Sequence, residues 1–259
     1  MIKKIKISKN EEYLIKFMDE YELDIFTYQE LTDDENLKII ELQLTLDSMI
    51  SRGLLSRIEK GKYCRHNFRD EYVIGNYLAQ DGAIAYWSAL NLHGLTEQIP
   101  NTVFVQTKKL KRNKTVFGVR YQFIKVKPEK ITGIAIAGYG NHSYKITDKE
   151  KTIMDCFDLP EYGGEFPGII RAFATNNWDE QKLINYAGKV NNTAAIKRMG
   201  YCAELFGLPL EKFIAFAKEK VTKTISLFDN NGTDDGNYNT TWGLRLNINS
   251  DDILEMKNY

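Results

Sequence analysis

The sequence predicts an α+β fold in which helices dominate and the strands form small sheets. Three observations lead to this prediction: three helical patterns followed by a hairpin pattern in the first 70 residues, alternating strand patterns in the middle of the chain, and four successive helical patterns after residue 160. With 259 residues, of which 43% are hydrophobic, two domains of ordinary size can each bury a core. We therefore predict one domain at 1–70 and a second, mixed α/β domain with a small sheet and several helices at 71–259.

The N-terminal pattern begins with a helix for which Asn10 is the expected N-cap, because two glutamates follow it in the first turn. A short second helix is expected at residues 28–31. A third is expected over residues 37–52, ending at Gly53 as the glycine that follows the C-cap. The next residues, LLSRIEKGKYCRHN, predict two short strands joined by a tight turn.

Three helices followed by a hairpin is the element order of a winged helix-turn-helix, in which the third helix enters the major groove and the wing contacts the DNA backbone. Two acids on the third helix, Glu41 and Asp47, oppose phosphate contacts. A protein-interaction module with a solvated basic hairpin is therefore the alternative. The residues predicted to contact DNA from these elements are Lys38, Gln43, Ser48, Arg52, Arg57, Lys60, Lys62 and Arg65.

Net charge is zero, with 35 basic and 35 acidic residues, but the charges are unevenly distributed. Residues 1–35 carry five lysines against ten acids, a net of −5, and residues 36–70 carry seven basic residues against four acids, a net of +3. Residues 103–130 carry nine basic residues against one acid, a net of +8. Such clustering is typical of a surface that contacts a polyanion, so the neutral total does not argue against a nucleic-acid partner.

The strand pattern TVFVQT is followed by the sequence KKLKRNK, which we call the basic segment (residues 108–114), and then by a second alternating strand. A basic loop between two strands suits contacts to a nucleic-acid backbone, whereas the alternative is a solvated hairpin. The residues of this segment predicted to contact DNA are Lys108, Lys109, Lys111, Arg112 and Lys114.

The sequence AYWSALNLHGLTEQIP places Ser88, His93 and Glu97 close together in the chain, as a hydrolase would require. Five residues on a helix separate Ser88 from His93 by about 140°. The strand–turn–helix glycine frame of a nucleophilic serine is also missing. We predict that Ser88 and His93 are structural, within a buried helix pair over residues 71–94, and that the protein is not an enzyme.

Carboxylates near residue 150 offer the alternative of a metal-dependent nucleotidyltransferase or nuclease that uses Asp148, Asp155 or Asp158. A metal site needs further carboxylates or histidines that the local sequence lacks. The motif TDKE predicts instead a capping box with Thr147 as the N-cap and Glu150 at the third helical position. No metal or cofactor is therefore predicted.

No apolar run approaches the roughly 20 residues that span a bilayer, so no membrane association is expected. The N-terminal segment MIKKIKISKN lacks an apolar core and a small-residue cleavage site, so no signal peptide is expected either. The three cysteines lack metal-type spacing and, without an export signal, predict reduced thiols. Together these features predict a cytoplasmic protein.

Four stretches of the sequence resemble the AbiEi family, the antitoxins of bacterial type IV toxin–antitoxin systems of the abortive-infection class. They are YWSALNLHGLTEQIP with the strand TVFVQT, TDKEKTIMDCFDLPEYGG, NNTAAIKRMGYCAELFGL and NYNTTWGLRLN. They occur in the order of the family and, with the N-terminal winged helix, cover nearly the whole chain. None of them is a catalytic motif.

The resemblance implies a DNA-binding antitoxin and transcriptional autorepressor whose winged helix binds inverted repeats in the promoter of its own operon. The second domain, an AbiEi-like C-terminal antitoxin domain, is expected to contribute to repression and to supply the antitoxin activity. The expected functional partner is a nucleotidyltransferase-like toxin, countered without a stable complex. A winged-helix regulator without a toxin stays an alternative.

Overall fold

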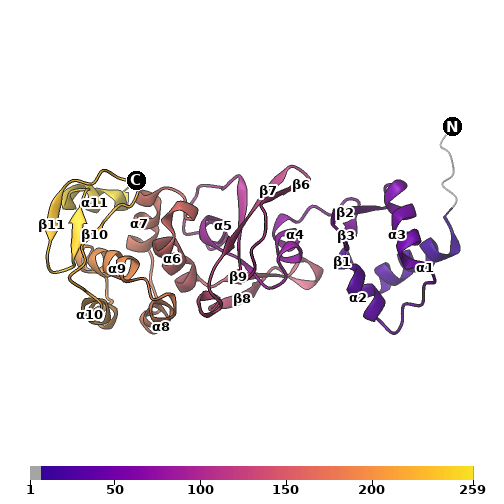
Figure 1. Cartoon of the computed structure of the whole chain (residues 1–259), viewed down its shortest axis with the longest axis horizontal. Helices are drawn as coiled ribbons and strands as arrows, with labels where there is room; N and C mark the ends of the chain where they lie inside the picture. The colour runs from indigo at the N-terminus through magenta and orange to yellow at the C-terminus, as the bar shows by residue number, and fades with distance from the viewer. Residues whose placement is uncertain (1–6, 259) are drawn as a thin grey trace.

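The computed structural model describes residues 7–258 and shows a mixed α/β architecture in which helices and small sheets follow one another along a long axis (Figure 1). The N-terminal Lys/Ile segment, on which the expectation of no signal peptide rests, lies mostly outside the described residues. Among residues 7–258, no helix combines the length and the apolar character needed to cross a membrane.

Residues 7–70, which we call the N-terminal unit, form three helices and a three-stranded antiparallel sheet in the strand order β1-β3-β2. The helices pack on one face of this sheet around Leu14, Phe26 and Leu46. The elements are α1 (Lys9–Glu20), β1 (Ile25–Thr27), α2 (Tyr28–Asp33), α3 (Leu42–Ser51), β2 (Leu55–Glu59) and β3 (Lys62–Arg65).

Two predicted helix starts in this unit are wrong. Ser8, not Asn10, caps α1, because its side chain accepts the backbone N–H of Glu11 and the Glu11 side chain accepts that of Ser8. The third helix begins at Leu42, since Glu41 has a φ of 60°, which a continuous helix does not allow. Its predicted end is confirmed, with Gly53 at a φ of 69°.

The middle of the chain forms a six-stranded mixed sheet in the order β6-β7-β5-β4-β9-β8. The pairs β5–β7 and β4–β9 are parallel and the other pairs are antiparallel. The predicted helix pair at 71–94 is interrupted by β4, which contains Ala83. The elements are α4 (Glu71–Leu78), β4 (Ala83–Ile84), α5 (Tyr86–Leu92), β5 (Thr102–Thr107), β6 (Lys114–Val116), β7 (Val119–Lys125), η1 (Pro128–Lys130), β8 (Ile134–Ala137), η2 (Gly140–His142) and β9 (Tyr144–Thr147).

The C-terminal part is mostly helical and contains a small three-stranded sheet in the order β10-β12-β11. Its first helix is capped by Asp148 and not by Thr147, because the Thr147 backbone belongs to β9. The elements are α6 (Lys149–Asp158), η3 (Pro160–Tyr162), α7 (Phe166–Ala174), α8 (Glu180–Val190), α9 (Thr193–Leu205), α10 (Glu211–Glu219), β10 (Ser226–Leu227), β11 (Asn237–Asn239), β12 (Leu244–Leu246), α11 (Ser250–Glu255) and η4 (Met256–Asn258).

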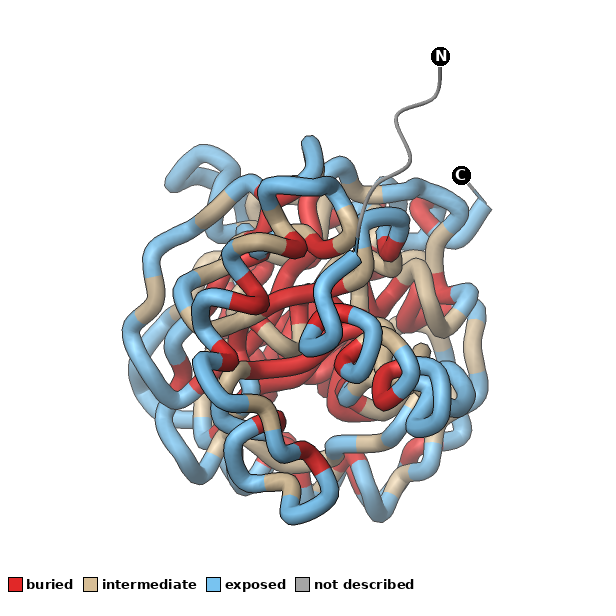
Figure 2. Tube along the Cα trace, turned by 90° about the vertical axis from the view of Figure 1, so that its right-hand side faces the viewer, coloured by how far each residue is buried: buried red, intermediate tan, exposed pale blue. Residues whose placement is uncertain are grey.

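The six-stranded sheet separates two hydrophobic cores, and its central strand β5 is buried along its whole length. Val103 and Val105 pack on one face with α4, whereas Phe104 belongs to the core that contains α6. This alternation follows from the two-residue period of a strand. Seen from the N-terminal end, buried segments occupy the interior of the molecule and exposed segments surround them (Figure 2).

The small sheet of the N-terminal unit is also buried on both faces. Phe26 and Tyr63 face the core of the unit, whereas Ile25, Ile58 and Cys64 belong to the core formed with α4 and the six-stranded sheet. Apolar packing is therefore continuous across the domain boundary predicted at residue 70. The position of the β2–β3 hairpin is set by both parts of the chain.

We expect Gly200→Ala in α9 to lower the free energy of unfolding by about 1–3 kcal/mol, because the added methyl group overpacks the core. An ideal Cβ at Gly200 would lie 2.4 Å from a ring carbon of Trp242 and 2.7 Å from Cβ of Ala217. The matched control is Gly188→Ala in α8, which meets nothing within 4 Å and should raise the free energy of unfolding by about 0.5–1 kcal/mol. Urea titration of both variants checks this, and equal effects would contradict it.

Candidate nucleic-acid interface

The residues predicted to contact DNA lie on three parts of the structure: α3 with the loop before it, the β2–β3 hairpin, and the basic segment between β5 and β6. Most of the cationic side chains on the first two parts are engaged by carboxylates of the same chain. The structure thus divides the predicted set into paired and unpaired residues.

Ser48 and Arg52, both predicted to contact DNA, direct their polar atoms at Glu11 of α1. Ser48 Oγ donates to Glu11 Oε1 at 2.8 Å, and Arg52 Nε lies 3.4 Å from the same oxygen. Burial raises the pKa of the Glu11 carboxyl, but hydrogen bonds from Ser8 and Ser48 and the charge of Arg52 outweigh it and hold the pKa below its usual range. These contacts tie α1 to α3.

The arginines of the hairpin form ion pairs within the N-terminal unit. Arg57 on β2 lies 2.5 Å from Asp47 of α3. Arg65 at the end of β3 lies 2.6 Å from Asp19 and 3.1 Å from Asp24. The acids of this unit therefore neutralise the arginines that flank them, which the uneven charge distribution of the sequence did not show.

Unpaired cations remain at the hairpin turn and along the basic segment. Lys60 is exposed in the tight turn that the positive φ of Gly61 makes possible, at 73°. Five of the cationic residues predicted to contact DNA are exposed and form no ion pair with any other described residue. They are Lys38, Lys60, Lys108, Lys109 and Arg112.

Glu59 at the end of β2 joins the hairpin to the basic segment, and the sequence analysis missed it. Its carboxylate lies 3.1 Å from Lys62 Nζ, 2.8 Å from Lys111 Nζ and 3.6 Å from Lys114 Nζ. Two segments predicted separately to contact a nucleic-acid backbone are thus side by side. No sequence signal identifies this pairing, because 52 positions separate Glu59 from Lys111.

The exposed face of α3 carries the amide of Gln43, the apolar side chain of Leu44 and the carboxylate of Asp47, and none of its described residues bears an unpaired positive charge. Leu44 is 62% exposed, and Ile40 in the loop before the helix is 84% exposed. The amide of Gln43 donates to the Asp47 carboxylate at 3.1 Å. This face suits contacts to bases or to another protein better than contacts to phosphates.

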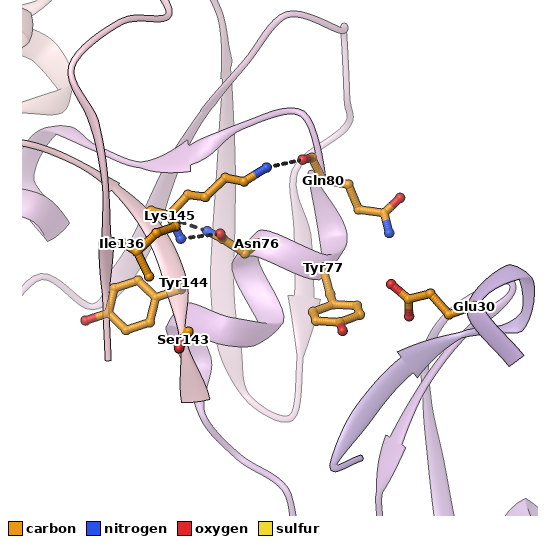
Figure 3. Close-up of a pocket in the computed structure, with 8 residues that line it drawn as sticks. All are labelled: Glu30, Asn76, Tyr77, Gln80, Ile136, Ser143, Tyr144 and Lys145. Atoms are coloured by element: carbon orange, nitrogen blue, oxygen red, sulfur yellow. Dashed lines mark hydrogen bonds between the residues drawn. The ribbon is translucent and has the colours of Figure 1, made fainter. Parts of the chain in front are cut away.

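A pocket of ≈ 380 Å³ lies between α2 and α4, next to β8 and β9 (Figure 3). Asn76 Nδ2 donates to the Lys145 carbonyl oxygen at 3.1 Å, Lys145 Nζ donates to the Gln80 carbonyl oxygen at 3.2 Å, and Glu30 accepts a capping hydrogen bond from Thr27 N. The side chains of Asn76, Lys145 and Glu30 are therefore used in structural bonds. The pocket is lined by Glu30, Asn76, Tyr77, Gln80, Ile136, Ser143, Tyr144 and Lys145.

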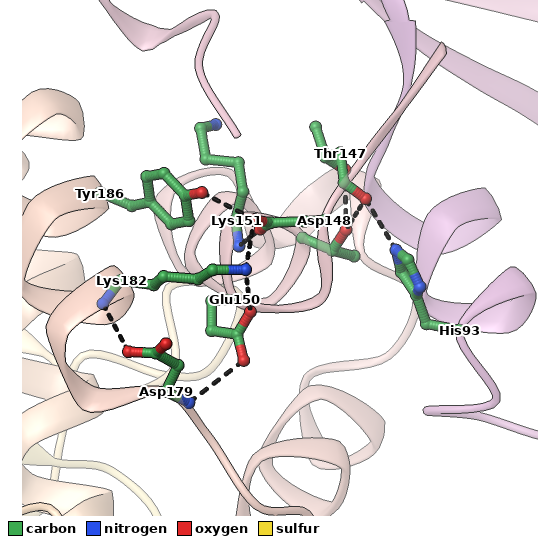
Figure 4. Close-up of polar contacts among 9 residues, drawn as sticks. His93, Thr147, Asp148, Glu150, Lys151, Asp179, Lys182 and Tyr186 are labelled. Carbon is green, nitrogen blue, oxygen red and sulfur yellow. Dashed lines mark hydrogen bonds and ion pairs between the residues drawn. The ribbon is translucent and has the colours of Figure 1, made fainter. Parts of the chain in front are cut away.

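Ser88 and His93 bond to different parts of the backbone. Ser88 Oγ accepts from Phe104 N at 3.0 Å and donates to the Thr102 carbonyl oxygen at 3.2 Å, which fixes α5 on β5. His93 Nε2 lies 2.7 Å from the Thr147 carbonyl oxygen (Figure 4). The predicted separation of the two side chains is confirmed, since each bonds to a different backbone segment.

The carboxylates considered for a metal-dependent enzyme are held by cations and hydroxyl groups of the chain. Asp148 caps α6, accepts from Tyr186 Oη at 2.7 Å and lies 3.2 Å from Lys182 Nζ (Figure 4). Within residues 7–258 there is no group of three His, Cys, Asp or Glu side chains that could hold a metal ion.

The two other candidate acids are buried in ion pairs. Asp155 pairs with Lys151, and both side chains are almost fully buried. Burial raises the pKa of Asp155 to about 6, against the opposing effect of the Lys151 charge. Asp158 lies 2.6 Å from Lys130 Nζ and accepts from Asn192 at 2.8 Å. The contacts of Asp158 link α6 to η1 and to the N-cap of α9.

Comparisons with known proteins concern the fold. No family model and no curated protein matches the sequence. Among solved structures, the chain is similar to the crystal structure of the RV2827C protein from Mycobacterium tuberculosis, with 13% sequence identity, a TM-score of 0.64 and 92% of each chain covered. At this identity the likeness shows that a similar arrangement of helices and sheets extends over almost the whole of another protein.

We expect Glu11→Gln to lower the free energy of unfolding at neutral pH by about 1–3 kcal/mol, because the charged hydrogen bonds to Ser48 and Arg52 are lost. The folded pKa of Glu11 is lowered, so the stability it contributes is present above its ordinary pKa and is lost as pH falls through the folded pKa. The difference between variant and parent should therefore shrink in acid. The control is Glu12→Gln on the exposed side of α1, which should change little at any pH.

Proposed function

We propose that the N-terminal unit is a winged helix-turn-helix that binds DNA. Two features of the structure support the proposal. The element order α1-β1-α2-α3-β2-β3 and the sheet order β1-β3-β2 suit such a unit, with α3 as the helix for the major groove and the β2–β3 hairpin as the wing.

The observation that carries the proposal is the meeting of the hairpin and the basic segment at Glu59. The hairpin and the basic segment carry Lys60, Lys108, Lys109 and Arg112, which form no ion pair with another described residue and would contact phosphates of a single duplex. The exposed side chains Gln43 and Leu44 of α3 would then face the bases: an amide suits adenine and an apolar side chain suits the thymine methyl group.

We further propose that this protein is a cytoplasmic, non-enzymatic antitoxin that represses its own operon through inverted repeats in the promoter. The four sequence stretches that resemble the AbiEi family support this part of the proposal. They fall on α5 with β5, on α6, on α9, and on β11 with β12, all outside the N-terminal unit. The functional partner would be a nucleotidyltransferase-like toxin, countered without a stable complex.

The second candidate function is that of a protein-interaction module. The observation in its favour is the exposed apolar pair Ile40 and Leu44 on and before α3, next to the carboxylates of Glu41 and Asp47. Such a face also suits a partner protein.

The DNA part of the proposal predicts that the protein binds the duplex upstream of its own gene with an affinity that falls steeply with salt. Replacing Lys108, Lys109 and Arg112 together by Gln should reduce the slope of log affinity against log salt by about 3, since each phosphate contact contributes roughly 0.9. Fluorescence anisotropy of a labelled duplex measures this. The matched control replaces three exposed lysines of the C-terminal part, Lys189→Gln, Lys212→Gln and Lys223→Gln, and should leave the slope unchanged. Loss of the difference between the two triple variants would remove the basic segment from the interface.

The antitoxin part predicts that co-expression with the product of a neighbouring nucleotidyltransferase-like gene restores growth, while the two proteins do not co-purify. Recovery of a stable complex would instead favour the protein-interaction module. In that case Leu44→Glu should break the complex, and the equally non-conservative control Leu254→Glu on α11, where Leu254 is 40% exposed, should not.

A further inference from the structure

Three lysines from two distant segments surround the single carboxylate of Glu59. Lys62 comes from β3, whereas Lys111 and Lys114 come from the basic segment and the start of β6. Lys111 Nζ contacts both carboxylate oxygens, at 2.8 and 3.0 Å, and the other two ammonium groups lie within 3.6 Å. The carboxylate thus occupies the centre of a cationic cluster.

The ammonium groups are held in place by other contacts as well. Lys62 Nζ donates to the Leu78 carbonyl oxygen at 3.0 Å, and Lys111 Nζ lies 5.3 Å from the centre of the Phe123 ring. The side chains of Lys62 and Lys111 are only 17% and 22% exposed, so the cluster is more than a set of solvated surface charges. Preorganised donors of this kind suit an anion.

The charges of the cluster do not balance. Three ammonium groups face one carboxylate, which leaves a local excess of positive charge. Burial lowers the pKa of Lys62, and the charges of Lys111 and Lys114 lower it further, although Glu59 opposes both. Burial raises the pKa of Glu59, but hydrogen bonds and charge from Lys111 and Lys62 outweigh it, so the carboxyl pKa lies below its usual range. Without the carboxylate, another anion would relieve the mutual repulsion of the three ammonium groups.

A cavity of ≈ 460 Å³ opens beside the cluster and gives a second anion room to enter. It is lined by the ends of α4 and β5, by the loop that follows α4, and by the hairpin and basic segment, with the lysines Lys62, Lys109 and Lys111 among its residues. The one carboxylate among the described residues of its wall, Asp81, accepts from Thr107 Oγ1 at 2.9 Å and from the backbone N–H of Lys108 at 3.1 Å. Burial raises the pKa of Asp81, but these bonds and the charge of Lys109 hold it below the usual range. An anion in this cavity is therefore favoured next to Lys62 and Lys111 and not next to Asp81.

We propose that Glu59 occupies a phosphate-binding position formed by Lys62, Lys111 and Lys114, and that a nucleic-acid phosphate takes its place when the carboxylate swings out. That the phosphate belongs to a nucleic acid rests on the proposed function, whereas the existence of the anion site does not. Glu59 acts as an internal competitor that weakens phosphate binding at the junction of the hairpin and the basic segment.

The test is Glu59→Gln, which keeps the size of the side chain and removes its charge. In about 50 mM inorganic phosphate, compared with chloride of equal ionic strength, the melting temperature of this variant should rise by about 3 °C, because a bound ligand stabilises the folded state. The parent protein should show no such rise. The variant should also bind the upstream duplex about three- to tenfold more tightly at low salt, with a steeper salt dependence.

Two controls isolate the site. Glu129→Gln removes the same charge from an exposed residue of η1 that forms no ion pair with another described residue, and it should behave as the parent protein. Adding Lys111→Gln to Glu59→Gln should abolish the response to phosphate. If Glu59→Gln does not fold, Glu59→Ala replaces it.

The outcomes separate the two proposals. No response of a folded Glu59 variant to phosphate, or failure of both variants to fold, would overturn the anion site, because Glu59 is then only structural. A parent protein that binds no duplex, combined with a Glu59→Gln variant that responds to phosphate, would reject the proposed function and keep the site. A response equal to that of Glu129→Gln would show a general charge effect and also overturn the site.

Discussion

Burial of the β1-β3-β2 sheet on both faces is the constraint on which the rest of the arrangement depends. Phe26 and Tyr63 pack against the helices of the N-terminal unit, while Ile25 and Cys64, their neighbours along the strands, pack against α4 and the six-stranded sheet. A strand shift of one residue would exchange these two sets, so the register is fixed from both sides. The hairpin is thereby held at a defined place on the larger sheet, within reach of the segment between β5 and β6.

Charge pairing then decides which cations face solvent. Glu11 and Asp19 of α1 and Asp47 of α3 neutralise Arg52, Arg65 and Arg57, respectively. The exposed pairs of Arg57 and Arg65 add little stability, whereas the pair of Arg52 with the buried Glu11 adds more. Their main consequence is for the surface, since they remove arginines from contact with a polyanion and leave the lysines of the hairpin turn and basic segment.

In the C-terminal part, buried ion pairs matter for stability and not for the charge of the surface. Lys151 with Asp155 and Lys130 with Asp158 lie between packed helices, where an unpaired charge would be strongly destabilising. Sequence patterns place these acids on a helix but cannot distinguish a metal ligand from the partner of a buried lysine, because the partner's position depends on packing. The structure assigns them to the interior.

Local sequence determined the type of most elements and several of their ends. Periodicity predicted the N-terminal helices and the hairpin, and the end of α3 was identifiable because the positive φ after its C-cap favours the glycine found there, Gly53. Tertiary structure decided what depends on distant residues: the start of α3, the six-stranded order of the central sheet, and the pairing of Glu59 with Lys111. The basic residues were visible in the sequence, but their division into paired and unpaired groups was not, because an ion pair is set by distance in space and no short-range pattern encodes it.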